Sequence, residues 1–287
     1  MARTDDVACA AVDIFRRAAE LNRLDERRDG NVLVIGSPRR IVVSGDIHGN
    51  RWALDKIISH ADLAADPQSR IVLQEILHGP PGDQGGHDPS IELLVQAAGL
   101  KIEHPEQVLF IMGNHDVAQV TESEISKYGY GVCKAFIEGL KAAFADDADE
   151  VMDALAEFFL SLPLAIRCPN GVFISHSLPS PGKFDDACIE ILTRPITAAD
   201  MLRGQPVYNW VWGRRHTEDQ LETLAAELGA EFFLMAHQHN KTGYDIISRR
   251  GAVVLSDHAG GYIVEFRDDQ KITGDSLEQY LKPLSAL

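Results

Sequence analysis

The sequence predicts a layered α/β fold. Three short apolar runs, at residues 41–44, 70–74 and 107–112, have the length and composition of buried strands. Segments with helical spacing at residues 51–60 and 90–100 separate them. Strands that alternate with helices at this interval are typical of a layered α/β sheet. Each run leads into a loop that contains glycine and polar residues, as expected at the ends of buried strands.

The elements before and between these strands are also read from their patterns. Residues 6–21 have an amphipathic helical pattern, which predicts an N-terminal packing helix. Residues 31–36 and 41–44 read as two strands joined by the turn SPRR, which suits a hairpin or a sheet edge. The middle third predicts a helical insert over about 121–162, with helices at 121–127, 132–144 and 149–162.

The last third returns to strands. A helix is expected over residues 217–228, because Thr217 has the character of an N-cap and Gln220 follows three residues later. Short strands are expected at 164–168, 171–175, 231–235, 244–248, 252–256 and 262–266. We therefore expect a single domain over 1–287, with its core at about 31–270.

Composition excludes several classes of partner. A net charge of -16 and a pI near 5.0 argue against nucleic acid and anionic membranes, because an acidic surface repels phosphate chains. No stretch approaches the roughly 20 apolar residues of a membrane span. The acidic start MARTDD lacks the basic region of a signal peptide. The four cysteines follow no metal-binding or disulfide spacing, so we expect a cytoplasmic protein. Nothing in the sequence indicates the oligomeric state.

Polar residues suited to metal binding follow the predicted strands. In a sheet whose strands run in one direction, such strand ends converge in one crevice. Carboxylates combined with imidazoles suit Zn, Mn or Fe. The residues in question are Asp46, His48, Glu75, Asn114, His115, His176, His237 and His239.

The motifs around these residues resemble those of the calcineurin-like metallophosphoesterases. They are GDIHG at 45–49, GNHD at 113–116, SHS at 175–177 and AHQH at 236–239. The segments IVVSGDIHGN and AHQHNKTGYDII resemble the phosphoprotein phosphatase branch of this family in particular. The resemblance spans roughly residues 42–266. It implies a two-sheet β-sandwich flanked by helices, and metal-dependent hydrolysis of phosphoesters.

The resemblance implies a dinuclear centre of Mn, Fe or Zn. Asp46 and His48 would bind one ion, and Asn114, His176 and His237 the other. His239 stands where general metallophosphoesterases place a further ligand to the first ion, a histidine that the phosphatase branch usually lacks. His115 would be the general acid, and Asp116 would orient it.

The second family motif, GDxxDRG, is altered here. Counting from the first motif places Glu75 at the bridging aspartate, His78 at the second aspartate and Gly79 at the phosphate-binding arginine. A glutamate can bridge two ions, and His78 can take the supporting role of the second aspartate. Asp83, in a Gly-Asp dipeptide beyond the strand end, is the competing bridge.

Losing that arginine leaves the substrate phosphate without a bidentate cation. Arg214 and Arg215, just before the helix at 217–228, are candidate replacements, and the alternative is that they are surface arginines at a helix start. Arg51 is a weaker candidate.

The resemblance implies a phosphomonoesterase of the Ser/Thr protein phosphatase type. Its substrate would be a phosphorylated protein or a small phosphoester. Two alternatives stay open. One is a diadenosine polyphosphate hydrolase or phosphodiesterase. The other is a catalytically weakened module that binds metal or phosphate.

Overall fold

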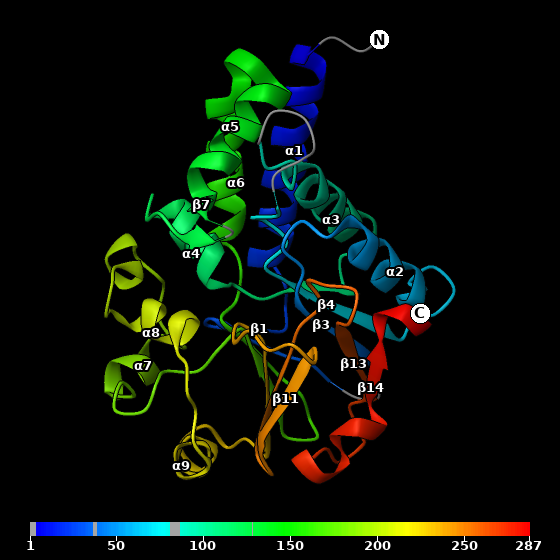
Figure 1. Cartoon of the computed structure of the whole chain (residues 1–287), viewed down its shortest axis with the longest axis vertical. Coiled ribbons are helices and arrows are strands. Elements are labelled where there is room, and N and C mark those ends of the chain that lie inside the picture. Colours follow the sequence, from blue (N-terminus) through cyan, green and yellow to red (C-terminus); the bar gives the residue numbers. More distant parts are fainter. Residues whose placement is uncertain (1–3, 37–38, 81–86, 128) are drawn as a thin grey trace.

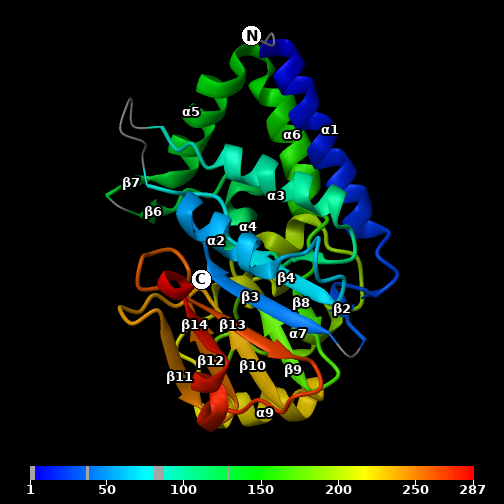
Figure 2. The same ribbon diagram turned by 90° about the vertical axis from the view of Figure 1, so that its right-hand side faces the viewer.

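Two β-sheets pack face to face, with helices over their outer faces (Figures 1 and 2). The computed structural model describes residues 4–36, 39–80, 87–127 and 129–287. In strand order, the larger sheet holds β1 (Arg28–Asp29), β2 (Val32–Val34), β8 (Ala165–Arg167), β9 (Val172–Ser175), β10 (Phe232–Met235), β12 (Gly251–Val254) and β11 (Tyr244–Ser248). The smaller sheet holds β14 (Leu281–Pro283), β13 (Tyr262–Arg267), β3 (Arg40–Asp46), β4 (Ser69–Gln74) and β5 (Val108–Phe110). The predicted layered α/β fold with two sheets is confirmed.

The central strands are buried on both faces. Along β3, Ile41 and Val43 join the core between the two sheets, where they lie with Ile174 and Leu234. Val42, between them in sequence, belongs instead to the core under the helices. Successive side chains of a strand point to opposite faces, and both faces are buried here. All three residues of 41–43 must therefore be apolar, and they are.

The helices form two groups. Figure 1 shows α1 (Thr4–Arg23), α3 (Ile91–Glu103), α5 (Val132–Phe144) and α6 (Ala148–Phe159) beside one another at the top of the molecule. The other helices are α2 (Arg51–Ala61), α4 (Asn114–Val120), α7 (Asp186–Glu190), α8 (Pro206–Trp212) and α9 (Glu218–Leu228). Short 3-10 turns lie at Ala145–Asp147, Ala198–Met201, Gly274–Gln279 and Leu284–Ala286. Among the described residues, no helix has the length and apolar character needed to cross a membrane.

Parallel pairing brings several strand ends to one rim of the sandwich. β3 pairs with β4 and β4 with β5 in parallel, and β9 pairs with β10 in parallel. Asp46, the last residue of β3, also forms a parallel β-bridge with Leu255, which directly follows β12 of the larger sheet. The carboxyl ends of strands from both sheets therefore meet where β3 ends.

Two local predictions were wrong. β2 and β3 do not form a hairpin, because β2 pairs with β8 in the larger sheet while β3 lies in the smaller one. Residues 121–127 are not helical: α4 ends at Val120, and β6 (Ser126–Lys127) pairs with β7 (Tyr130–Gly131). The carboxylate of Glu124 accepts the backbone N–H groups of Cys133 and Lys134, and so it caps the start of α5 rather than continuing α4.

Candidate metal centre

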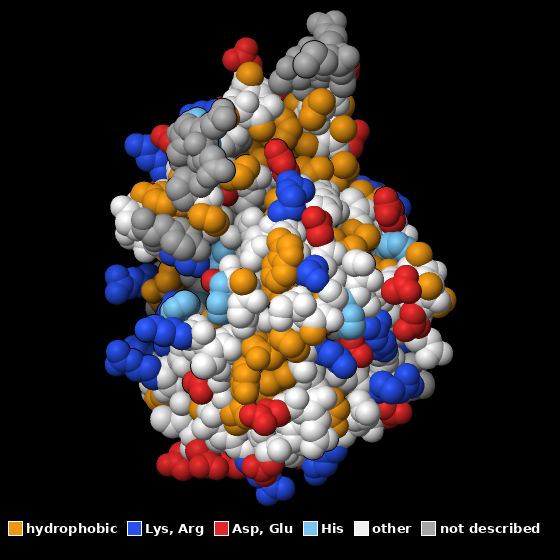
Figure 3. All heavy atoms as spheres, turned by 45° about the vertical axis from the view of Figure 1, so that its right-hand side comes forward, with side chains coloured by type: hydrophobic (Ala, Val, Ile, Leu, Met, Phe, Trp, Pro, Cys, Tyr) orange, Lys and Arg blue, Asp and Glu red, His pale blue; other side chains and the backbone are white. Residues whose placement is uncertain are grey.

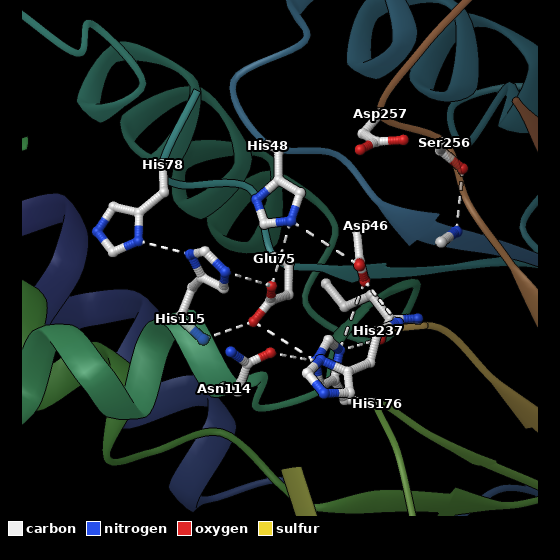
Figure 4. Close-up of polar contacts among 12 residues, drawn as sticks. Asp46, His48, Glu75, His78, Asn114, His115, His176, His237, Ser256 and Asp257 are labelled. Atoms are coloured by element: carbon white, nitrogen blue, oxygen red, sulfur yellow. Dashed lines mark hydrogen bonds and ion pairs between the residues drawn. The ribbon is translucent and has the colours of Figure 1, made fainter. Parts of the chain in front are cut away.

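The residues that follow the parallel strands point toward one another (Figure 4). Asp46 ends β3, and His48 lies on the turn after it. Glu75 directly follows β4, and Asn114 and His115 open α4 after β5. The larger sheet contributes His176 after β9 and His237 after β10. All seven side chains are buried.

The backbone at these positions is unusual. Positive φ angles occur at His48 (44°), Glu75 (45°), His78 (63°) and His237 (65°). Residues with a Cβ avoid this region, and such strain is typical of binding and catalytic sites, where surrounding structure imposes it. The sharp turns here direct polar side chains inward immediately after a strand ends.

Glu75 lies at the centre of the cluster. Its Oε1 accepts the backbone N–H of His115 at 2.7 Å and lies 3.6 Å from His176 Nε2. Its Oε2 lies 3.5 Å from His48 Nε2 and makes no hydrogen bond within the described residues. Two groups of potential ligand atoms therefore share this one carboxylate. The first group is His48, Glu75 and His115, and the second is Asp46, Glu75 and His176.

Gly113 makes room for the Glu75 side chain. A Cβ at position 113 would lie 2.2 Å from Glu75 Oε1 and 2.5 Å from its Cγ. The extra methylene of a glutamate, compared with an aspartate, thus occupies space that only glycine leaves open at this point.

The second side of the cluster comes from Asn114, His176 and His237. Asn114 Oδ1 and His176 Nε2 lie 2.9 Å apart, and the rings of His176 and His237 are 4.9 Å apart. The His237 backbone N–H donates to Asp46 Oδ1 at 3.3 Å. His237 Nε2 is buried and has no hydrogen-bond partner among the described residues.

Burial shapes the electrostatics of the site. It raises the pKa of Asp46 to about 7, with the charge of Asp257 adding to the effect. Burial, with the nearby Asp46 and Asp116, also raises the pKa of Glu75 well above its usual range. Burial lowers the pKa of His176 to about 3, so its imidazole stays neutral. Ionised carboxylates buried at this site are unfavourable unless a cation neutralises them. Together with neutral imidazoles, which can act as ligands, they form an environment that binds cations.

The residues present fit divalent metal ions. Two buried ligand atoms, Glu75 Oε2 and His237 Nε2, lack hydrogen-bond partners in the described part of the chain. Oxygen and imidazole nitrogen donors are the set that Zn, Mn and Fe prefer. Because an unpaired buried polar atom costs free energy, bound cations would satisfy both atoms.

His115 has a further partner outside the cluster. Its Nδ1 lies 2.7 Å from Nδ1 of His78, and Nε2 of His78 lies 2.9 Å from Oε1 of Gln119. His78 is fully buried, and burial lowers its pKa to about 4. Asp116 accepts the Gly113 N–H at 2.7 Å and thereby caps α4, rather than contacting His115.

A cavity of about 200 Å³ opens over these residues. Arg214 lines it with an exposed side chain, whereas Arg215 is not among its lining residues. His239 also lines it, but its side chain is exposed and belongs to neither group of ligand atoms. Asp83 lies outside the described residues.

Six lining residues were not among the sequence-based candidates: Ile125, Ser126, Lys127, Trp212, Leu255 and Asp257. Lys127 Nζ lies 3.9 Å from Asp257 Oδ2, and the Trp212 ring lies 6.0 Å from that of His237. Trp212 lies two residues before Arg214, one of the candidate phosphate-binding arginines, so its place in the sequence was the available signal. Figure 3 shows histidine and basic side chains meeting along one edge of the molecular surface.

Comparisons with known proteins identify the family of the chain. A model of the calcineurin-like phosphoesterases matches residues 39–241, so the chain belongs to this family, whose members use divalent metals. A probable serine/threonine-protein phosphatase of Encephalitozoon cuniculi is 25% identical over 238 residues, which are 82% of this chain and 48% of that protein. The chain thus spans about half the length of this curated relative.

Solved structures share the fold. A serine/threonine phosphatase of Saccharomyces cerevisiae with similarity to human phosphatase PP5 aligns with a TM-score of 0.66 at 16% identity, over 90% of this chain and 82% of that one. A cold-active protein-tyrosine phosphatase of a psychrophilic Shewanella species aligns with a TM-score of 0.57 at 14% identity, over 86% and 78%. At such identities these likenesses show the fold alone.

Proposed function

We propose that the chain hydrolyses phosphomonoesters at a dinuclear metal centre, in the manner of a Ser/Thr protein phosphatase. The observation that carries the proposal is the Glu75 carboxylate, whose two oxygens face two separate groups of ligand atoms. In two-metal phosphatases the ions activate water and neutralise charge on the phosphoryl group.

The assignment of ligands to each ion is proposed from the family resemblance; in the structure Asp46 lies with Glu75 and His176, and His48 lies with Glu75 and His115. Asp46 and His48 would hold one ion, Asn114, His176 and His237 would hold the other, and Glu75 would bridge them. His239 is a further ligand to the first ion only if its exposed side chain turns inward. Mn, Fe and Zn all suit this donor set.

His115 would donate the proton to the leaving alkoxide. It lines the cavity, and its Nε2 lies 3.9 Å from Glu75 Oε2, so this edge of the ring faces the reaction site. Its Nδ1 edge is held by His78. Asp116 would act indirectly, because it caps the helix that carries His115. A positioned general acid typically contributes 10² to 10⁴ in rate.

Lys127 and Arg214 would bind the substrate phosphate in place of the arginine that Gly79 replaces. Both line the cavity, and they come from different elements. The β6–β7 hairpin that carries Lys127 is anchored at that same glycine, because the Tyr130 hydroxyl donates to the Gly79 carbonyl at 3.0 Å. Arg215 is not among the residues that line this cavity, so we assign the role to Arg214.

The substrate is proposed from the relatives. A phosphorylated serine or threonine in a protein, or a small phosphomonoester, would place its phosphate between the metal ligands and these two cations. In this proposal the protein acts in the cytoplasm, where its four free cysteines stay reduced.

The test is hydrolysis by the full chain reconstituted with Mn²⁺. An aryl phosphate, its diester and a phosphoserine peptide are compared for the parent, Glu75→Ala and Asp83→Ala. We expect turnover of the monoesters by the parent and by Asp83→Ala, and none by Glu75→Ala. A fully metallated parent that is inert on every substrate contradicts the proposal and favours a metal-binding module, whereas faster turnover of the diester favours a phosphodiesterase.

A further inference from the structure

A second cavity lies at the opposite ends of the strands that build the metal centre. Its volume is about 420 Å³, and Arg27, Arg39 and Arg70 are among its lining residues. Arg39 directly precedes β3, and Arg70 is the second residue of β4. The metal ligands follow the other ends of these strands, roughly 20 Å away for a strand of six residues. We call this space the Arg70 cavity.

Arg70 is a buried cation in this cavity. Only 4% of its surface is exposed. Its Nη1 donates to the backbone carbonyls of Pro67 at 2.8 Å and Ser69 at 2.9 Å. Nε is buried and makes no hydrogen bond within residues 4–36, 39–80, 87–127 and 129–287, and no carboxylate of these residues forms an ion pair with the guanidinium.

The unused edge of this guanidinium has a specific shape. Nε–H and the neighbouring Nη2–H point in parallel, which is the edge that pairs with two oxygens of a carboxylate or phosphate. A buried charge without an opposite charge is unfavourable. Burial lowers the pKa of Arg70, and the positive charges of Arg39 and Arg27 lower it further, whereas the carboxylates of Glu106 and Asp66 raise it.

The acidic residues of the cavity do not neutralise Arg70. Both carboxylate oxygens of Asp25 accept from Arg27, at 2.8 Å from Nε and 2.6 Å from Nη2, so these two residues satisfy each other. Glu26 and Glu106 also line the cavity, but their side chains are exposed and form no ion pair with Arg70. The cavity is within the size range of small-molecule sites.

We propose that the Arg70 cavity binds a small molecule through an oxyanion, a phosphate or a carboxylate, held by Arg70 and Arg39. The site is separate from the metal centre, so the ligand is an effector rather than the substrate. The polar carboxylates of Glu26 and Glu106 at the opening suit a ligand that also carries hydrogen-bond donors.

The experiment is equilibrium dialysis of the full chain with labelled inorganic phosphate and, separately, with labelled succinate. A His237→Asn background removes the contribution of the metal centre to phosphate binding. Arg70→Gln is compared in this background with Arg250→Gln, a matched control whose guanidinium already pairs with Glu222 and Glu231. Unfolding midpoints with and without each probe are measured in parallel.

We expect one bound probe per chain, about tenfold or more weaker binding in Arg70→Gln and unchanged binding in Arg250→Gln. The probe should raise the unfolding midpoint of the protein that retains Arg70, but not that of Arg70→Gln. Binding of phosphate alone or of succinate alone identifies the oxyanion. If Arg70→Gln does not fold, Arg39→Gln is judged by the same criterion.

Absence of binding of both probes at millimolar concentration overturns the proposal, as does equal binding by Arg70→Gln. Neither result depends on the metal centre. Failure of the proposed phosphatase activity would leave these measurements unchanged, so the two proposals are tested separately.

Discussion

His78 and His115 meet through their Nδ1 atoms at 2.7 Å. One nitrogen must donate and the other accept. His78 Nε2 faces the carbonyl oxygen of Gln119 at 2.9 Å, so its proton lies on Nε2 and its Nδ1 accepts. His115 therefore donates from Nδ1 and presents Nε2 to the cavity. A neutral imidazole here holds the ring of His115 without the negative charge that a carboxylate would supply.

Replacing His78 by aspartate should therefore change the pH dependence. Burial holds the pKa of His115 well below its usual range. An ionised carboxylate beside Nδ1 stabilises the imidazolium and raises this pKa, so the loss of activity at high pH should move to higher pH. The measurement is the pH profile of kcat for the parent and His78→Asp. Identical profiles would show that His78 does not tune His115.

Gly113→Ala should disable the centre while leaving the fold intact. The new Cβ would lie 2.2 Å from Glu75 Oε1 and must displace the carboxylate. A displacement on the ångström scale lowers activity by about 100-fold. The control is Gly99→Ala within α3, where nothing lies within 4 Å of the added Cβ and the helix should gain about 0.5–1 kcal/mol. Turnover and chemical unfolding of both variants check this, and a fully active Gly113→Ala would refute the crowding.

Lys127→Met should weaken substrate binding. Losing a charged contact to a phosphate lowers affinity by about 10- to 100-fold, so KM rises by that factor for a dianionic monoester. Lys134→Met, an exposed lysine on α5, is the control and should behave as the parent. Steady-state kinetics on an aryl phosphate separate KM from kcat. Equal KM values for the two variants would remove Lys127 from the substrate site.

Lys101 makes stability depend on pH. Its side chain is 1% exposed, and burial lowers its pKa from 10.5 to about 8. Below pH 8 the amine is protonated in both the folded and the unfolded chain. Between about pH 8 and 10.5 only the unfolded chain retains the proton, so this residue makes the free energy of unfolding rise with pH, by at most about 3 kcal/mol.

Lys101→Met should flatten that rise. Urea unfolding at pH 7.5 and 9.5 measures the difference for the parent, the variant and the exposed control Lys141→Met. The variant also loses hydrogen bonds to the carbonyls of Pro105 and Val108, so its absolute stability can fall at both pH values. A slope equal to that of the parent would show that Lys101 is not the group responsible.

Sequence patterns predicted the layered sheets because their strands are apolar on both faces, as β3 shows. They also selected residues that the structure places together, since parallel strands bring their carboxyl ends to one rim. The β6–β7 hairpin was missed, because strands of two residues have no period to detect. The Tyr130 hydroxyl of this hairpin contacts the carbonyl of Gly79, 51 positions earlier in the chain.

The Arg70 cavity lay beyond prediction for a related reason. Arg70 reads as the polar start of an apolar strand, and the sequence does not reveal that it is buried with no carboxylate partner among the residues that the structure describes. Arg39 and Arg27 reach the same space from the start of β3 and the segment after α1. Only the folded arrangement of these separate segments defines a site.

The most direct measurement is the metal content of the full chain after reconstitution with Mn²⁺ and dialysis, with turnover assayed on the same samples. The parent and Glu75→Gln are compared, since glutamine keeps the shape of the side chain but removes the bridging charge. We predict two ions per chain and hydrolysis of an aryl phosphate by the parent, and at most one ion and no turnover by Glu75→Gln. Two ions and undiminished turnover in Glu75→Gln would contradict the dinuclear centre bridged by Glu75.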